Sequence, residues 1–195
     1  MYSKRQWKHY WLNKKKESDT TSLLPIIVPC PDHDIKNEES NKKPKILAHI
    51  GARGTAYWNV RLLCHLFDFE EVRIHSKRVE SRENFANKLS EDLKRPIKVT
   101  DDWENCILDA DIVVEASRLS KPEPLLKTEW IKKGALVIPY GTMSALEFSL
   151  PDIMDKFVMD DWGQAHGVFG ALREHIDKGK ITFETLHAEI GRAHI

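Results

Sequence analysis

The stretch KILAHIGARGTAYWNV, residues Lys45–Val60, decides the fold class of this 195-residue chain. Its apolar run, Ile46–Ile50, ends at Gly51, and a segment of helical period follows. A glycine that ends a strand and opens a helix is typical of dinucleotide-binding folds. The usual pattern places a second glycine two residues later, where this chain has Arg53, and Gly54 comes one residue late. The sequence therefore raises the question whether this turn still binds a pyrophosphate.

Each residue of this turn has a role in the predicted cofactor site. Gly51 provides the tight turn, and Ala56 allows close packing of the helix on the strand. If the chain bends so that Gly54 makes the close approach to the phosphate, the Arg53 side chain does not block the phosphate site. Its guanidinium can then pair with the phosphate. The helix N-terminus with Thr55 presents free N–H groups to an anion. A purely structural strand–helix turn is the alternative.

Beyond this stretch, short apolar runs rich in β-forming residues alternate with longer segments of helical period. The pattern predicts strands at 46–50, 71–75, 97–100, 111–116, 135–139 and 156–160. It predicts helices or turns at 55–67, 80–93, 102–108 and 127–132. Such alternation implies right-handed crossovers and a parallel sheet covered on both faces. We therefore expect an α/β fold, a Rossmann-like doubly wound parallel sheet in a domain of residues 45–195, with a helical C-terminus that includes a helix at 164–177.

Residues 1–44 have a different composition. The first sixteen contain six Lys or Arg residues and no acid, and three prolines lie between Pro25 and Pro31. One short apolar patch, Leu23–Val28, cannot bury much surface by itself. The sequence predicts a flexible basic and polar tail at 1–44, and RNA contact or an organelle address are the alternatives for its basic start.

The overall composition is that of an ordinary globular protein. Lys and Arg together number 30, as do Asp and Glu, so the formal net charge of zero does not point to a nucleic-acid partner. The cysteines Cys30, Cys64 and Cys106 have no metal-ligand spacing, which fits a reducing compartment. No apolar run is long enough for a membrane span, and no signal core is present. We expect a cytoplasmic protein without a metal site.

The residues after the second predicted strand bear on the choice of cofactor. An NAD site places Asp or Glu there to bind the ribose 2′-hydroxyl. This chain instead has Ser76, Lys77 and Arg78, which follow Gly51 by 25 to 27 positions. A hydroxyl and two cations suit a 2′-phosphate, so NADP(H) is favoured over NAD(H). A solvated basic turn is the alternative.

Four segments occur together in an order that is known from one protein family. They read IGARGTA, EVRIHSKRVESRENFA, DADIVVEASRLSKPEPLLKTEWIKKGALVIPYG and DKFVMDDWGQA. The third, which runs from Asp109 through a Ser-x-x-x-Pro loop, is the most specific. From about Lys45 to Gly191 the chain resembles the ornithine cyclodeaminase/μ-crystallin family.

The resemblance implies an NAD(P)-dependent oxidoreductase that acts on amino acids, imino acids or cyclic imines. Members of the family transfer hydride between the substrate carbon and the nicotinamide ring. It also implies cofactor contacts at the ends of two later strands, where parallel sheets bind ligands. The residues near the nicotinamide ribose would be Ser117, Arg118 and Leu119, and those flanking the ring would be Tyr140, Gly141 and Thr142.

The chain departs from the family pattern at the position of the proposed acid/base of the cyclodeaminase branch. That branch has an aspartate just after the fifth-strand glycine, where this chain has Met143. A thioether cannot transfer a proton, so ornithine cyclisation is disfavoured. Glu147 is expected to be a helix-surface carboxylate and His166 a surface or capping residue. Asp160 and Asp161 are expected to cap a helix or border the cofactor. No catalytic residue is predicted.

The chain also departs from the family in length. The family carries a substrate domain of about a hundred residues before the Rossmann segment, and residues 1–44 do not match it. The expectation is the cofactor half of such an enzyme. The competing hypothesis is a non-catalytic NADP(H)-binding or interaction protein that kept the fold. The partner would be an amino or imino acid if the chain is active, and the resemblance leaves a homodimer open.

Overall fold

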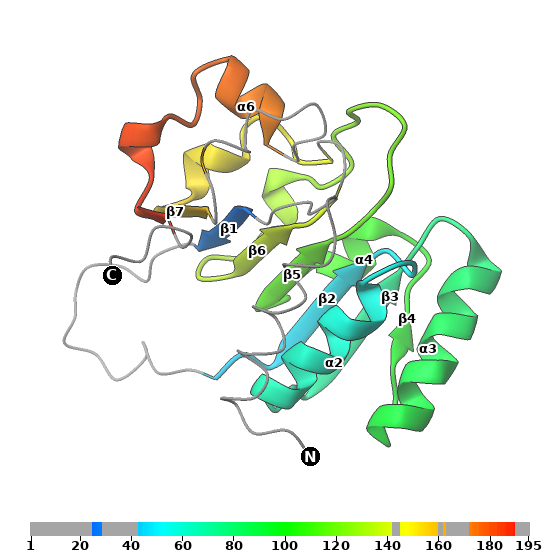
Figure 1. The fold of residues 1–195 in the computed structure, drawn as a ribbon. Coiled ribbons are helices and arrows are strands. Elements are labelled where there is room, and N and C mark those ends of the chain that lie inside the picture. Colours follow the sequence, from blue (N-terminus) through cyan, green and yellow to red (C-terminus); the bar gives the residue numbers. More distant parts are fainter. Residues whose placement is uncertain (1–24, 29–42, 142–144, 160–161, 163–171, 190–195) are drawn as a thin grey trace, which may run out of the picture.

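Residues 25–28, 43–141, 145–159, 162 and 172–189 are described by the computed structural model of this chain (Figure 1). They form one eight-stranded sheet with the strand order β4-β3-β2-β5-β6-β1-β7-β8. The strands are β1 (Pro25–Val28), β2 (Ile46–Ile50), β3 (Glu71–His75), β4 (Lys98–Val99), β5 (Ile112–Glu115), β6 (Leu136–Pro139), β7 (Lys156–Met159) and β8 (Ala188–Glu189).

Strands β4, β3, β2, β5 and β6 are parallel neighbours, in the order that Rossmann-like folds share. Successive side chains of a strand point to opposite faces, so two cores form. Leu47 belongs to the core under α2 and α3, and Ala48 belongs to the core on the other face. The predicted Rossmann-like fold is therefore confirmed.

Helices cover both faces of the parallel strands (Figure 1). Helices α2 (Ala56–Leu66) and α3 (Val79–Leu93) pack on one face, and α4 (Trp103–Ile107) packs on the other. Helix α4 begins where Asp102 accepts a hydrogen bond from the Asn105 amide at 2.7 Å. The short 3-10 helices are η2 (Thr128–Trp130), η3 (Leu150–Ile153) and η4 (Phe183–Thr185), and one further short helix is α6 (Arg173–Asp177).

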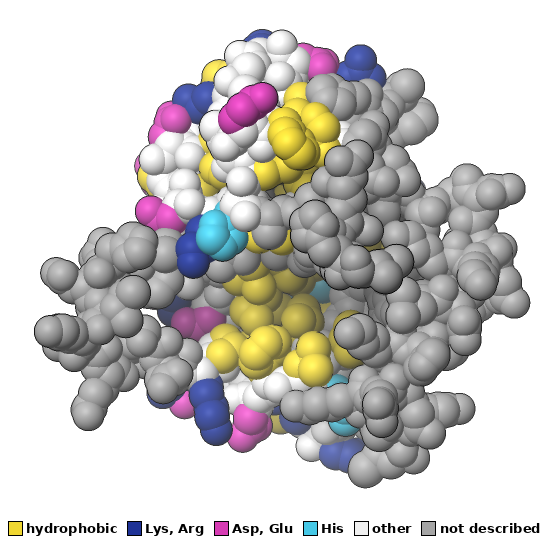
Figure 2. Space-filling model, turned by 60° about the vertical axis from the view of Figure 1, so that its left-hand side comes forward, with side chains coloured by type: hydrophobic (Ala, Val, Ile, Leu, Met, Phe, Trp, Pro, Cys, Tyr) yellow, Lys and Arg dark blue, Asp and Glu magenta, His cyan; other side chains and the backbone are white. Residues whose placement is uncertain are grey.

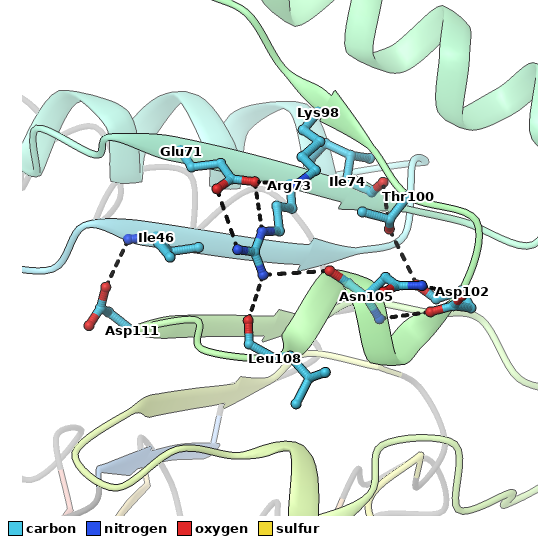
Figure 3. Close-up of polar contacts among 10 residues, drawn as sticks. All are labelled: Ile46, Glu71, Arg73, Ile74, Lys98, Thr100, Asp102, Asn105, Leu108 and Asp111. Carbon is cyan, nitrogen blue, oxygen red and sulfur yellow. Dashed lines mark hydrogen bonds and ion pairs between the residues drawn. The ribbon is translucent and has the colours of Figure 1, made fainter.

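A polar cluster links β3 to β4 and α4 (Figure 3). Two of its members, Glu71 and Lys98, are the first residues of β3 and β4. The Arg73 guanidinium donates to Glu71 at 2.9 Å and to the Leu108 carbonyl at 2.5 Å. Lys98, which lies beside Arg73 on β4, pairs with the same Glu71 oxygen at 2.9 Å. These two cations lower the pKa of Glu71 to about 2. The cluster therefore fixes strands and does not reach the opposite edge, where cofactors bind in this fold.

Strand β1 is a difference from the sequence-based expectation. It pairs antiparallel with both β6 and β7, and Ile27 lies opposite Val137 on one side and Phe157 on the other. These four residues fall within the segment 1–44 that the sequence predicts to be a flexible tail. The pattern did not predict the strand because its partners follow more than a hundred residues later, and the local sequence offers only a short apolar run between prolines.

The C-terminal part is described over residues 172–189. Of the helix predicted at 164–177, the residues 173–177 form α6, and the remainder lies outside the described residues. The strand predicted at 156–160 is β7, which ends at Met159. Strand β8, which pairs parallel with β7 at the sheet edge, was not predicted.

One face of the molecule gathers hydrophobic side chains at its centre, with charged residues around them (Figure 2). The described chain also exposes several large hydrophobic side chains singly, among them Trp58, Leu66 and Ile153. In the described parts of the chain, no helix combines the length and the apolar character that a membrane crossing requires.

Candidate functional site

The turn after β2 is built around a glycine that admits no side chain. Gly51 has a φ of +106°, and a Cβ there would lie well within van der Waals contact distance of the carbonyl oxygen of Ala116, the residue after β5. The Gly51 amide donates to the His75 carbonyl at 2.8 Å. The turn is therefore held between the carboxyl ends of β3 and β5, where ligands bind in open parallel sheets.

The next part of this turn has backbone amides without a hydrogen-bond acceptor in the described parts of the chain. Among the described residues, none accepts a hydrogen bond from the amides of Arg53, Gly54 or Thr55. Helix α2 begins directly afterwards, at Ala56, and its first turn contains no acid. Gly54 has a φ of +61°, a left-handed conformation that turns its amide relative to its neighbours. Free amides at a helix N-terminus form a site that favours an anion.

Two guanidinium groups belong to the same edge of the sheet. Arg53 is exposed within the turn itself. A terminal nitrogen of Arg118, from the segment after β5, lies 3.5 Å from the position that a Cβ on Gly54 would take. The structure therefore brings Arg118 to the glycine turn, although the resemblance places it near the nicotinamide ribose. The buried Ala56 packs α2 against the sheet as the sequence predicts.

The residues predicted to bind a 2′-phosphate lie at the end of β3. Ser76 is half-buried and donates to the Arg78 carbonyl at 3.3 Å, and Lys77 and Arg78 are exposed. Within the described ranges neither cation has an ion pair. The sequence analysis missed Arg82, whose buried guanidinium donates to the Ser76 carbonyl at 3.4 Å and pairs with Asp101 at 2.5 Å. Arg82 thus ties the Ser76 turn to the segment after β4.

The residues predicted to lie near the nicotinamide follow β5 and β6. Ser117 and Leu119 are half-buried, as is Tyr140, whose amide donates to the Glu115 carbonyl at 2.5 Å. Gly141 is buried beside Glu115, and Thr142 lies outside the described residues. The structure therefore brings the segments after β2, β5 and β6 to one edge of the sheet. The predicted residues at the end of β3 adjoin them through the bond from Gly51 to His75.

Glu115, the last residue of β5, is a buried carboxyl that the sequence analysis did not single out. It has no exposed surface, and its Oε1 accepts from the Ser117 amide at 2.8 Å and from the Ser117 hydroxyl. Its Oε2 has no hydrogen-bond partner among the described residues. Burial raises the pKa of Glu115 to about 7, although the hydroxyl and amide of Ser117 and the backbone of Gly141 oppose that change. In sequence it reads as part of the buried run DIVVEA, and a charged residue in such a run is the signal that was available.

His49, on β2, is a second buried polar residue that the sequence analysis missed. Its Nδ1 lies 3.0 Å from the Gly51 carbonyl, and its ring is 6.3 Å from that of Phe85 on α3. Burial lowers the pKa of His49 to about 4, so the ring is neutral at pH 7. A neutral imidazole with Nδ1 protonated donates a hydrogen bond to the Gly51 carbonyl and so stabilises the glycine turn.

The remaining sequence candidates have other outcomes. Glu147 is not on a helix: it precedes η3, and its carboxylate accepts from the Thr128 amide at 2.8 Å at the start of η2. The expectation of a helix-surface carboxylate was wrong because the neighbouring Leu146 pairs with Leu126 in an isolated parallel bridge and Glu147 lies outside any helix. The other candidates lie outside the described residues; they are Met143, Asp160, Asp161 and His166.

Comparison with known protein families gives one match. The model of the ornithine cyclodeaminase/mu-crystallin family matches residues 40–157, which is more than half of the chain. Among curated proteins, an alanine dehydrogenase from Archaeoglobus fulgidus is 26% identical over 157 residues, covering 78% of this chain and 46% of its own length. The ketimine reductase mu-crystallin of Rattus norvegicus is 28% identical over 96 residues, covering 49% of this chain and 29% of its own length.

Solved structures share the fold. A Thermococcus litoralis Δ1-pyrroline-2-carboxylate reductase in complex with NADH and L-proline superposes with a TM-score of 0.69 at 21% identity, covering 78% of this chain and 48% of its own. The iminosuccinate reductase of Paracoccus denitrificans in complex with NAD⁺ gives 0.65 at 22% identity, with 77% and 46% covered. The chain spans less than half of the length of each of these relatives. It belongs to the ornithine cyclodeaminase/mu-crystallin family.

Proposed function

We propose that this chain binds NADP(H) as the cofactor part of an oxidoreductase that transfers hydride at an amino- or imino-acid carbon. The observation that carries the proposal is the turn after β2. Three consecutive amides, those of Arg53, Gly54 and Thr55, have no acceptor within the described parts of the chain, and α2 begins beside them without an acid. A pyrophosphate satisfies such donors and gains from the helix dipole.

The preference for NADP(H) rests on the end of β3. Two exposed cations, Lys77 and Arg78, stand where a carboxylate would bind the ribose 2′-hydroxyl of NAD. A carboxylate there would repel a 2′-phosphate, whereas two cations attract it. The related reductases from Thermococcus litoralis and Paracoccus denitrificans have NADH and NAD⁺ in their structures, so the proposed NADP(H) preference would distinguish this chain from those relatives.

The substrate class is proposed from the family. The named relatives are alanine dehydrogenase, ketimine reductase, pyrroline-carboxylate reductase and iminosuccinate reductase. The compounds in these names, an amino acid, a ketimine, a pyrroline carboxylate and an iminosuccinate, all have a carbon–nitrogen bond. When bound, the nicotinamide would supply or accept the hydride. The residues of this chain would orient the ring through the segments after β5 and β6, which meet at Glu115.

A binding titration tests the cofactor assignment. NADPH and NADH are titrated separately against the wild-type chain and against the double variant Lys77→Ala/Arg78→Ala, with nicotinamide fluorescence as the signal. We expect the variant to lose NADPH affinity by about tenfold or more, since a hydrogen bond to a charged group contributes about 1.5–3 kcal/mol. Its NADH affinity should stay unchanged.

A matched control removes two positive charges elsewhere. Lys43→Ala/Lys178→Ala changes an exposed residue before β2 and another after α6, and it should leave both affinities as in the wild type. An equal loss of NADPH affinity in both double variants would mean that the effect comes from the change in net charge and not from a contact at Lys77 or Arg78. NADH binding that is tighter than NADPH binding would refute the NADP(H) preference, and failure of both cofactors to bind would refute the cofactor role of the turn.

A second candidate function is an NADP(H)-binding protein without catalysis. The observation that favours it is Met143, which takes the place of the cyclodeaminase acid/base and has no proton to transfer. Oxidation of NADPH is measured with a cyclic imine carboxylate and with pyruvate plus ammonia. Tight NADPH binding without turnover of either substrate supports this candidate, and turnover above the rate without protein excludes it.

We also propose a homodimer and a cytoplasmic location. An archaeal alanine dehydrogenase with the same fold has been solved as a dimer with bound NAD. The location rests on cysteine usage: Cys64 and Cys106 are free thiols in the structure, and a reducing compartment preserves such thiols. Sedimentation velocity decides the assembly state, with a single monomeric species as the contrary result.

A further inference from the structure

Glu115 is the buried acid at the point where the cofactor segments converge. It ends β5, with Ile50 of β2 beside it on one side and Pro139 of β6 on the other. The Gly51 turn follows the first of these neighbours and Gly141 follows the second. The carboxyl therefore lies beneath two of the segments that the proposed function assigns to the cofactor.

The contacts of this carboxyl are with the Ser117 segment after β5 and with the Gly141 turn after β6. The Ser117 amide and hydroxyl both donate to Oε1, the amide at 2.8 Å. Oε2 faces Gly141 so closely that a Cβ there would overlap it. Side chains of Glu seldom occupy fully buried positions without a partner for each oxygen, and Oε2 has none among the described residues. A hydrophobic residue would fill the same volume at a lower desolvation cost.

The ionisation of Glu115 is set by burial, by Ser117 and by the backbone of Gly141. Among the described residues, Tyr140 is the titratable group beside it at the β6 end, and the exposed Arg118 follows on its own segment. On the same sheet face, His75 of β3 is separated from it by Ile50, and His49 packs on the other face against Phe85. No charged side chain in this part of the chain pairs with Glu115. Burial places its pKa at about 7.

We infer that Glu115 is a positioning residue of the cofactor site: it holds the Ser117 segment against the Gly141 turn, and its ionisation sets how firmly the two are held. The inference rests on the proposed function for the identity of the ligand. The carboxylate accepts two charge-assisted hydrogen bonds from Ser117, which are stronger than the bonds to a neutral acid. Protonation would weaken both and would place on Oε2 a proton that lacks an acceptor in the described structure. Cofactor affinity should therefore fall as the pH drops through 7.

The experiment compares the wild type with Glu115→Gln, which is isosteric and permanently neutral. The dissociation constants for NADPH and NADH are measured from pH 6 to 8.5. The 2′-phosphate of NADPH titrates near pH 6, so the ratio of the two proteins' constants is used, in which that effect cancels. We expect the variant to bind roughly fivefold to tenfold more weakly at pH 8.5 and about as well as the wild type at pH 6. Glu91→Gln, an exposed control on α3, should match the wild type throughout.

A second measurement reads the same contact without cofactor. The ¹⁵N shift of the Ser117 amide is followed with pH in the free protein, and it should titrate near pH 7 in the wild type and stay flat in Glu115→Gln. Ser117→Ala removes one donor to the carboxylate and should move the midpoint upward, and it serves if Glu115→Gln does not fold. A ratio of dissociation constants that is constant with pH, or an amide that does not titrate, would overturn the inference. If no variant binds either cofactor, the proposed function fails, and the amide titration still decides whether Glu115 holds Ser117.

Discussion

Gly51 is the residue on which the glycine turn depends, for two separable reasons. Its φ of +106° is costly for any residue with a Cβ, and that Cβ would also overlap the Ala116 carbonyl oxygen. Gly134 allows the cost of the positive φ to be measured without the overlap. Its φ is +82°, and no described atom lies within 4 Å of the position that a Cβ would take.

The change Gly51→Ala should therefore cost more than Gly134→Ala. We expect a loss of about 2–4 kcal/mol in the free energy of unfolding for the first, from backbone strain plus the overlap. For the second we expect about 1–2 kcal/mol, from the left-handed backbone alone. Urea unfolding at pH 7 measures both. Equal losses would mean that β5 yields to the new methyl group and that the turn is not tightly held.

The predicted and unpredicted site residues differ in kind. Gly51 and Ser76 could be named in advance because the glycine turn and the strand end carry local signals, whereas Gly141 follows from the family resemblance. Arg82 could not be named in advance, since it acts by reaching another segment, where it pairs with Asp101. Glu115 has a signal in sequence, a charged residue within a buried run, but its approach to Gly141 depends on a neighbouring strand. Such contacts depend on the register of neighbouring strands, which one sequence does not specify.

At the scale of elements, strands β3 and β4 and helix α4 are joined by the polar cluster around Arg73. Glu71 receives both Arg73 and Lys98, and its pKa is lowered to about 2. A carboxylate whose folded-state pKa is depressed contributes stability that is present above its unfolded pKa and is lost as the pH falls through the folded value. For Glu71 that window runs from about pH 4.5 down to about 2.

The variant Glu71→Gln should be less stable than the wild type at pH 7, and the difference should shrink as the pH falls through this window. The side chain is 33% exposed, so solvent screening limits the loss to about 1 kcal/mol. Urea unfolding at pH 7, 4 and 3 measures it. Glu83→Gln, an exposed change on α3, should show no such convergence with the wild type. A loss that is independent of pH would assign Glu71 a packing role instead.

Local pattern was sufficient for the elements whose partners are close in sequence. The predicted helices at 55–67 and 80–93 are α2 and α3, with shifts of one residue at their ends. The predicted strand at 97–100 is shorter in the structure, where β4 is Lys98–Val99 and pairs with β3 alone. The alternation of apolar and polar residues reflects burial on one face of a strand. In an edge strand with one neighbour, this alternation extends over more residues than the hydrogen-bonded pairing does.

At the scale of the whole molecule, β1 connects the parallel sheet to β7 and β8. It lies between β6 and β7 and pairs antiparallel with both, so among the described strands these four residues make the sheet continuous. Ile27 is at the middle of this connection, opposite both Val137 and Phe157. A residue that cannot donate a backbone hydrogen bond there would weaken a ladder on which the far strands depend.

The change Ile27→Pro should therefore destabilise the sheet beyond β6 by on the order of 3 kcal/mol. Ile27→Val keeps the backbone donor and the β-branched shape, and it serves as the control. Hydrogen exchange should show faster exchange at β7 and β8 in the proline variant, with β2 and β3 unchanged. Uniform acceleration across all strands would show that the sheet unfolds as one unit. Unchanged exchange at β7 would remove β1 from its proposed role.

The position of β1 also has a consequence for synthesis of the chain on the ribosome. Its first partner residue lies roughly 110 positions downstream, so at ordinary elongation rates this strand waits on the order of ten seconds before its neighbour exists. The parallel strands β2 to β5 can pair during that interval, because each partner follows soon after the last. The nascent protein thus completes the parallel strands first and closes the sheet last, and its short apolar strand is exposed to chaperones for most of that time.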